Sequence, residues 1–314
     1  MHYQSIPKKL FFGLICSLIV HTGLYAQHFT TINTGEGIEI MEGGKKVLFY
    51  QVQPKTVNGE YERAGYVHPL YGLNETILTD DMPADHPYHR GIFWAWHQIL
   101  LNDKNIADGW MSDHIGWKPA EVKIKKEKNK IALHSQMIWN TISSDNQLKP
   151  IVREETIITV YKSMNQYRIM DFDIQLFPLV DHLKIGGSDD HKGYGGFCLR
   201  LKLPGDLSFI SQNKEVVPEE TPVYAGPWMD FTGSFAGENF PKSGVVVFGY
   251  APIPEGKYPW ILRSTTSMQN IPYPGRIPVE LPKKGLHLSY RIIVHNGEMS
   301  SGDIEKLYQE YYHL

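Results

Sequence analysis

The densest group of potentially reactive side chains lies in residues 85–97, which read Asp-His-Pro-Tyr-His-Arg-Gly-Ile-Phe-Trp-Ala-Trp-His. An imidazole has an unperturbed pKa of about 6.5 and therefore suits proton transfer near neutral pH. The guanidinium of Arg90 offers a planar fork for a carboxylate or a sulfate. We predict that His86 and His89 perform acid/base chemistry and that Arg90 and His97 contact the substrate. A chance cluster in a folded loop is the alternative.

A metal site is a competing interpretation of this histidine segment (residues 85–97). Imidazole nitrogens of His86 and His89, together with His97 or His114, would suit zinc or copper. The proline between the first two histidines disfavours a regular helix there, and no His-Glu-x-x-His pattern occurs. Neighbouring carboxylates at positions 80 and 81 could hold a structural ion. We predict no required cofactor and keep a divalent metal as an open alternative.

A second cluster, the glycine segment, spans residues 189–200 and places glycines at 193, 195 and 196 among polar side chains. Glycine permits close approach of the backbone. Since no helical pattern follows, the segment does not resemble a phosphate-binding loop. We predict that Tyr194 and His191 are acid/base groups facing the histidine segment, and that Asp190 and Lys192 contact the substrate. A solvated β-turn is the alternative.

A third group combines tryptophans with arginines later in the chain. Trp228 and Trp260 could stack on sugar rings, and Arg263 and Arg276 could hold an anion. We assign Trp228 and Arg263 to substrate binding. Packing in the core is the alternative for each tryptophan.

The elements that must position these residues are mainly β-strands. Residues 286–295 and 170–176 alternate between apolar and polar side chains, which is typical of strands with one buried face. Residues 153–161 precede the second of these across a predicted hairpin at 162–166, and residues 245–248 form a short apolar strand. The chain contains 28 glycines and 20 prolines, which would punctuate a large antiparallel β-sandwich.

Only the C-terminus predicts a helix. Ser300 and Asp303 resemble a capping box, and Ile304, Leu307 and Tyr311 recur at helical spacing. No low-complexity linker interrupts the chain, so residues 27–314 are predicted to form one domain.

The N-terminus has the pattern of a secretory signal peptide. Lys8 and Lys9 precede a short apolar run, and Ala26 supplies a small residue before the expected cut. We predict a signal peptide over residues 1–26 and an exported chain, periplasmic or secreted. After cleavage Cys198 is the remaining cysteine, which excludes an internal disulfide, and a buried apolar role suits it.

Charge and hydropathy exclude two classes of partner. The full chain has a net charge of -3, and the signal peptide would remove two lysines, so a generic nucleic-acid binder is excluded. No apolar stretch approaches the ~18 residues of a membrane span. A few local cations in a pocket could still bind an anionic ligand.

Three motifs in order resemble an exported bacterial family often labelled "PmoA". They are the His-Pro-Tyr-His-Arg-Gly-Ile-Phe-Trp-Ala block at 86–95, Asp-Gly-Trp at 108–110 and Lys-Gly-Tyr-Gly-Gly-Phe at 192–197, and the resemblance covers roughly residues 30–295 on motif order. The label borrows the name of a membrane-bound methane oxygenase subunit, an activity that we reject because no span is present. Where relatives often carry His-Pro, this chain has Ala251-Pro252, which puts a fourth pocket histidine in doubt.

The resemblance implies a galactose-mutarotase-like β-supersandwich whose relatives act on carbohydrates in a concave sheet face. It raises the expectation of a carbohydrate ligand without choosing the reaction. A glycoside hydrolase needs two opposed carboxylates, and candidates such as Glu154, Glu155 and Asp230 are not marked out by their surroundings. The histidines, tyrosine and cations instead suit removal of a proton beside a carboxylate.

We therefore expect a lyase or dehydratase that performs β-elimination on uronic-acid-containing oligosaccharides during polysaccharide degradation. A glycoside hydrolase or mutarotase-like enzyme is one alternative. A non-catalytic carbohydrate-binding protein is the other.

Overall fold

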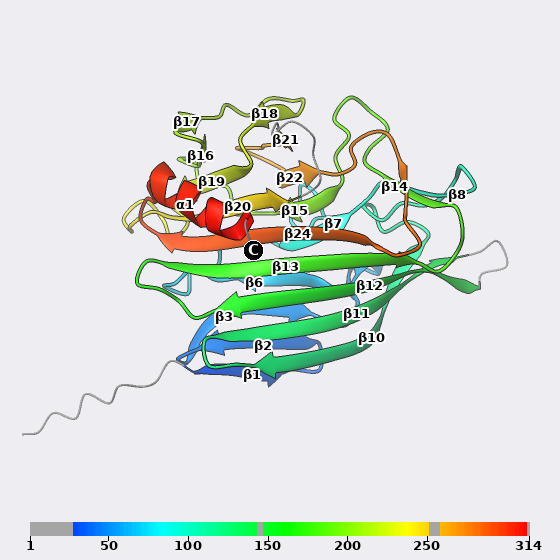
Figure 1. Ribbon diagram of the computed structural model, residues 1–314, viewed down its shortest axis with the longest axis horizontal. Coiled ribbons are helices and arrows are strands. Elements are labelled where there is room, and N and C mark those ends of the chain that lie inside the picture. Colours follow the sequence, from blue (N-terminus) through cyan, green and yellow to red (C-terminus); the bar gives the residue numbers. More distant parts are fainter. Residues whose placement is uncertain (1–27, 143–146, 251–257, 313–314) are drawn as a thin grey trace, which may run out of the picture.

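The computed structural model describes residues 28–142, 147–250 and 258–312. In this part of the chain, two large antiparallel sheets stack as the layers of a β-sandwich, and a single helix lies near the C-terminus (Figure 1). The mainly β fold and the C-terminal helix are therefore as predicted. The expected signal peptide and the Ala251-Pro252 pair lie outside the described residues.

One layer is a nine-stranded sheet, which contains the long alternating segments that the sequence predicted. Each predicted strand forms, and β12 and β13 pair antiparallel across the expected hairpin. In spatial order the described strands are β10 (Ile115–Lys126), β11 (Lys130–Ile142), β12 (Leu148–Tyr161), β13 (Tyr167–Pro178), β24 (Leu286–Asn296), β20 (Ser243–Tyr250), β19 (Trp228–Gly233), β16 (Ser208–Ser211) and β17 (Lys214–Glu215).

The other layer is a seven-stranded sheet built mostly from the N-terminal part of the chain. In spatial order its described strands are β1 (Phe29–Asn33), β2 (Gly37–Glu42), β3 (Lys45–Gln51), β6 (Tyr66–Leu70), β7 (Ile92–Ala95), β15 (Gly196–Leu199) and β22 (Gln269–Pro272). Smaller sheets are formed by β23 (Val279–Glu280), β14 (Leu183–Gly186), β8 (Gln98–Leu101) and β9 (Lys104–Ala107), by β18 (Val223–Ala225) with β21 (Tyr258–Trp260), and by β4 (Lys55–Val57) with β5 (Glu60–Arg63).

The main hydrophobic core lies between the two sheets. Strand β13 shows how the alternation produces it, since Phe172 and Ile174 are buried whereas Asp171 and Asp173 point to the opposite face. Residues from both layers belong to the same apolar cluster, and Tyr50 of β3 donates a hydrogen bond of 2.9 Å to Ser135 of β11 across the sandwich. Burial of apolar side chains from both sheets therefore holds the layers together.

The helix α1 (Ser301–Tyr312) lies across β20 and β24 on the outer face of the nine-stranded sheet (Figure 1). Its start is capped as predicted, because the backbone N–H of Asp303 donates to Ser300 Oγ at 3.1 Å. Ile304 and Tyr308 pack there against an apolar patch that includes Phe248. No helix in the described part of the chain is long and apolar enough to cross a bilayer.

Candidate active site

The outer face of the seven-stranded sheet carries a second, smaller apolar cluster. Along β7, Ile92 and Trp94 join the core between the sheets, whereas Phe93 and Ala95 point the other way and join this cluster. Cys198 of β15 is buried beside them, and burial raises the pKa of its thiol well above the usual value. Cys198 therefore has the packing role that the sequence predicted.

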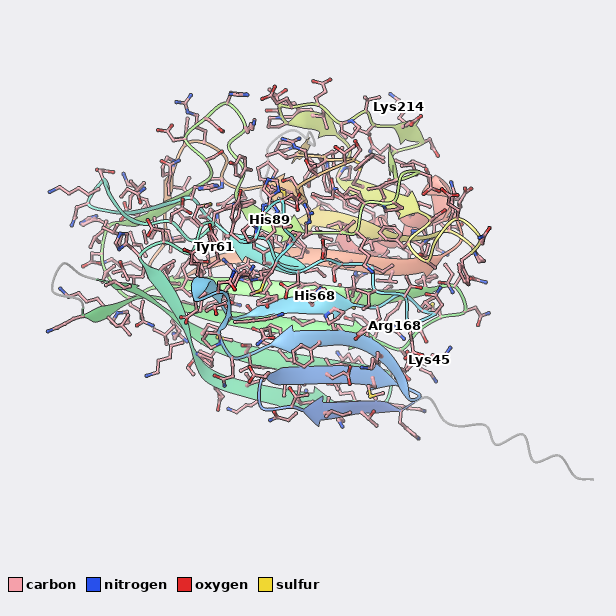
Figure 2. All side chains as sticks on the ribbon, turned by 180° about the vertical axis from the view of Figure 1, so that it is seen from behind. Lys45, Tyr61, His68, His89, Arg168 and Lys214 are labelled. Atoms are coloured by element: carbon pink, nitrogen blue, oxygen red, sulfur yellow. The ribbon has the colours of Figure 1, made fainter. Side chains whose placement is uncertain are left out.

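A cavity of about 190 Å³ lies over this outer face, and both predicted clusters contribute to its wall. Residues that precede β7 and β15 come from opposite ends of the sheet, because these strands are antiparallel. Each strand is only about 13 Å long, so loops from both ends can meet over its face. Figure 2 views the molecule from this side, with His89 labelled above the blue N-terminal strands. The lining residues are His86, Tyr88, His89, Trp110, Lys192, Tyr194, Ile261, Arg263, Thr266, Ser267 and Met268.

Asp85 orients the imidazole of His86. The Nδ1 atom of His86 lies 2.9 Å from Oδ2 of Asp85, and the same oxygen accepts a hydrogen bond from the backbone N–H of Ser267. The other oxygen, Oδ1, accepts a hydrogen bond from Arg200. Partial burial raises the pKa of Asp85, but these three hydrogen bonds outweigh it and hold the pKa well below its usual range. With Nδ1–H donated to an ionised carboxylate, the Nε2 lone pair of His86 is left as a base.

His89 has the same side chain in a very different environment. It is 1% exposed, and its ring stacks on that of His86 with centroids 4.6 Å apart and planes within 4°. Burial, followed by electrostatic interactions with His86 and Arg200, lowers the pKa of His89 to about 2. His89 is therefore neutral at physiological pH, which suits hydrogen bonding better than proton uptake.

Tyr194 and Trp110 form an aromatic wall of the cavity, and His97 lies behind both of them. The ring of His97 stacks on Trp110 at 5.3 Å and meets Tyr194 edge-on at 5.0 Å, while its Nδ1 lies 2.8 Å from Asp108. Burial raises the pKa of the Tyr194 phenol, so the group is a protonated acid at neutral pH. The structure thus places His97 beside the lining residues rather than among them.

The backbone around Tyr194 is fixed by glycines and by polar side chains. Gly193 has a φ of 60°, and a Cβ there would approach the backbone nitrogen of Arg276 to 2.8 Å. Asp190 accepts hydrogen bonds from Ser188 and from two backbone N–H groups, which lower its pKa although partial burial raises it. Asp190 therefore shapes the glycine segment and does not line the cavity, contrary to its predicted contact with the substrate.

Two cations also line the cavity. Lys192 comes from the glycine segment and Arg263 from the loop before β22, and both were predicted to contact the substrate. Arg263 donates to the backbone carbonyls of Glu219 and Glu220, and burial lowers the pKa of its guanidinium. The cavity therefore combines two imidazoles, two phenols and two cations.

Arg90 does not take the predicted anion-binding position. It is fully buried, and its guanidinium donates to the backbone carbonyls of Pro87, His89 and Tyr61. The fork that would hold a carboxylate instead ties the loop of the histidine segment to strand β5, because the acceptor Tyr61 belongs to that strand. We therefore reassign Arg90 from substrate binding to the support of this loop.

Two further predicted residues lie outside the cavity. His191 is exposed on the glycine segment and does not belong to the lining that Tyr194 joins. Trp228 is fully buried beneath α1 and donates its indole N–H to Glu305 at 2.9 Å. The predicted acid/base role of His191 and the predicted sugar platform at Trp228 are therefore corrected.

One family comparison bears on the whole chain. Residues 37–309 match DUF6807, a family of unknown function. The chain belongs to the DUF6807 family. No curated protein matches the sequence. The family match names neither an activity nor a ligand, so the chemistry of this DUF6807 chain must be argued from its side chains.

Several lining residues of the DUF6807 chain were not predicted. Tyr88 lies inside the histidine segment, but Ser267 and Met268 belong to a stretch that has no recognisable motif. Trp110 belongs to the Asp-Gly-Trp motif, in which Asp108 also accepts the backbone N–H of Trp110 at 2.8 Å. That motif was therefore the available signal for the aromatic wall.

The metal interpretation needs several ligands close together. In the described part of the chain, no group of three or more His, Cys, Asp or Glu side chains is placed to hold an ion. His86 and His89 stack face to face, His97 pairs with Asp108, and His114 lies exposed 3.7 Å from Asp113. The carboxylate of Asp81 accepts from Lys55 at 2.7 Å.

A second cavity, of about 260 Å³, lies on the outer face of the nine-stranded sheet over β10 to β13. Its polar side chains come from neighbouring strands and include Glu155, Gln136 and Asp173. These groups largely bond one another or nearby residues, as Gln136 does with Glu155 at 3.3 Å and Asp173 with Ser289 at 2.7 Å. The first cavity, which we call the histidine cavity, is the stronger candidate for a functional site. Its lining residues have shifted pKa values and supply several kinds of reactive group.

Proposed function

We propose that this chain is an exported carbohydrate-active enzyme that performs β-elimination on uronic-acid-containing oligosaccharides, as a lyase or a dehydratase. One observation carries the proposal: His86, Tyr194, Lys192 and Arg263, from three separate loops, line the same small cavity. Such an elimination needs a base, an acid and positive charge beside the substrate carboxylate. The resemblance to exported relatives of galactose mutarotase supports a carbohydrate ligand and the export of the chain.

Each group has a role that its environment supports. Lys192 and Arg263 would neutralise the uronate carboxylate and so acidify the proton at C5. His86, with Nδ1 held by Asp85, would take that proton at Nε2 as the C4–C5 double bond forms and the C4–O bond breaks. Tyr194 would protonate the departing oxygen, because its phenol is protonated at neutral pH. The neutral His89 would supply a hydrogen bond rather than a charge.

The described lining contains no Asp or Glu, so a hydrolase mechanism that uses two opposed carboxylates has less support. A mutarotase that uses His86 and Tyr194 would need no such pair. Tyr88 and Tyr194, the two partly exposed aromatic lining residues, also favour a second candidate, a non-catalytic protein that captures glycans by stacking.

Turnover of acidic oligosaccharides tests the proposal. Incubation with saturated and unsaturated uronides should yield either a new conjugated product, absorbing at about 235 nm, or a loss of water seen by mass spectrometry. His86→Ala should lower kcat by roughly 10²–10⁴-fold, the usual contribution of a positioned acid/base group. His191→Ala is the matched control, because this histidine lies nearby but outside the cavity.

The alternatives give different outcomes. New reducing ends without a chromophore would favour hydrolysis, and exchange of anomers without cleavage would favour mutarotation. If the protein binds uronides, turns over none and loses only affinity in His86→Ala, the glycan-capture candidate replaces the enzyme.

A further inference from the structure

Both cations of the cavity are held by the same short loop, residues 216–222, which connects β17 to β18. The carboxylate of Glu220 lies 3.4 Å from Lys192 Nζ, and the backbone carbonyl of Glu220 accepts from Arg263 at 3.0 Å. The adjacent Glu219 offers Arg263 only its backbone carbonyl, at 2.8 Å. Glu220 is thus the residue whose side-chain charge meets a lining cation.

We propose that Glu220 determines the charge selectivity of the cavity by acting as an internal counter-ion that an acidic ligand must displace from Lys192. The inference rests on the proposed function, since it takes the carboxylate of a uronide as the displacing group. In the ligand-free protein Glu220 keeps the ammonium group of Lys192 paired beside the cavity. A neutral sugar leaves this pair intact, whereas a uronate replaces it.

Exposure and geometry make this exchange feasible. The side chain of Glu220 is 75% exposed and that of Lys192 is 27% exposed, so the carboxylate can return to water at small cost. Arg263 donates its two hydrogen bonds to backbone carbonyls of this loop, so these bonds do not depend on the side chain of residue 220. Replacement of Glu220 by glutamine therefore removes the competing charge while leaving the loop attached.

The test compares Glu220→Gln with Glu219→Gln, which removes the same charge from the same loop, whereas the ion pair of Lys192 is with Glu220. Ligand-observed NMR titration measures the affinities for glucuronate and for glucose, which differ at C6. Glu220→Gln should raise the ratio of the two affinities about two- to fivefold, the scale of an exposed ion pair. Glu219→Gln should leave the ratio near that of the wild type.

A second readout needs no sugar. The contact with the Glu220 carboxylate holds the amine of Lys192 in place and so limits the access of a methylating reagent to it. Lys192 should therefore be methylated faster in Glu220→Gln than in Glu219→Gln or in the wild type, as measured by peptide mass spectrometry. Equal rates in all three proteins would overturn the proposal, whatever the ligand result.

The outcomes separate this inference from the proposed function. Glucuronate binding with equal affinity ratios in both variants overturns the role of Glu220 and leaves the uronide proposal intact. Faster methylation in Glu220→Gln without glucuronate binding to any variant overturns the uronide proposal and the selectivity with it, but confirms the counter-ion contact. If Glu220→Gln and Glu219→Gln change the affinity ratio or the methylation rate equally, the loss of any negative charge from the loop is sufficient. That result would overturn the assignment to Glu220.

Discussion

At the scale of single residues, the site shows how two neighbouring histidines acquire different chemistry. His86 is partly exposed and is tied to a carboxylate, so its free nitrogen can act as a base. His89 is buried against the ring of His86, and the cost of burying a charge keeps it neutral. The sequence identified both residues but could not separate their roles, because the separation depends on Asp85, Arg200 and burial.

His89 predicts a measurable pH dependence of stability. An unfolded histidine takes up a proton below about pH 6.5, whereas folded His89, with its pKa lowered to about 2, does not. The unfolded state then binds more protons, so the free energy of unfolding falls as the pH falls from about 6.5 towards 2. This contribution is at most about 1.4 kcal/mol per pH unit, and His89→Gln should remove it.

Urea unfolding between pH 7 and pH 4 measures this slope. His191→Gln is the control, since it removes a histidine from the surface. A wild-type slope that matches the slope of His89→Gln would mean that His89 takes up its proton in the folded state.

At the scale of elements, the sequence predicted what local periodicity encodes. Period-two alternation located β13 and β24, the adjoining hairpin located β12, and the capping residues located α1. It could not show which side chains meet across loops. Arg90 and Trp228 have residue types suited to ligand binding, yet the fold uses one to support a loop and the other to seat α1. Such assignments depend on contacts between distant segments, which periodicity does not specify.

The packing of α1 predicts a large but local effect on stability. Ile304 is fully buried against the outer face of the nine-stranded sheet, so Ile304→Ala should lower the free energy of unfolding by about 2–5 kcal/mol. Glu310→Ala changes an exposed residue of the same helix and should have an effect within about 0.5 kcal/mol. Chemical denaturation measures both.

The affinity of the histidine cavity for glucuronate should not change in Ile304→Ala, because α1 packs on the other sheet. A loss of affinity at a temperature where the variant remains folded would contradict this separation of the helix from the site.

At the scale of the whole molecule, the sandwich joins its layers by polar contacts as well as by the core. Glu42 of β2 accepts from Arg168 of β13 at 2.7 Å, with 1% and 4% of the two side chains exposed. The backbone N–H of Ser163 also donates to Glu42. Figure 2 labels Arg168 beside the blue strands of the seven-stranded sheet, although it belongs to the other layer. The sequence contained no signal for this pair, because 126 positions separate its members.

This ion pair predicts a strong asymmetry between single and double substitution. Glu42→Met leaves the buried guanidinium of Arg168 without its counter-charge and should lower the free energy of unfolding by about 3–5 kcal/mol. Adding Arg168→Met removes the uncompensated charge, so the double variant should regain most of that loss. Urea unfolding of the four proteins of this double-mutant cycle gives the coupling free energy. Additive losses would show that the pair contributes no coupling between the layers, which would then be held by apolar burial and by contacts such as that of Tyr50 with Ser135.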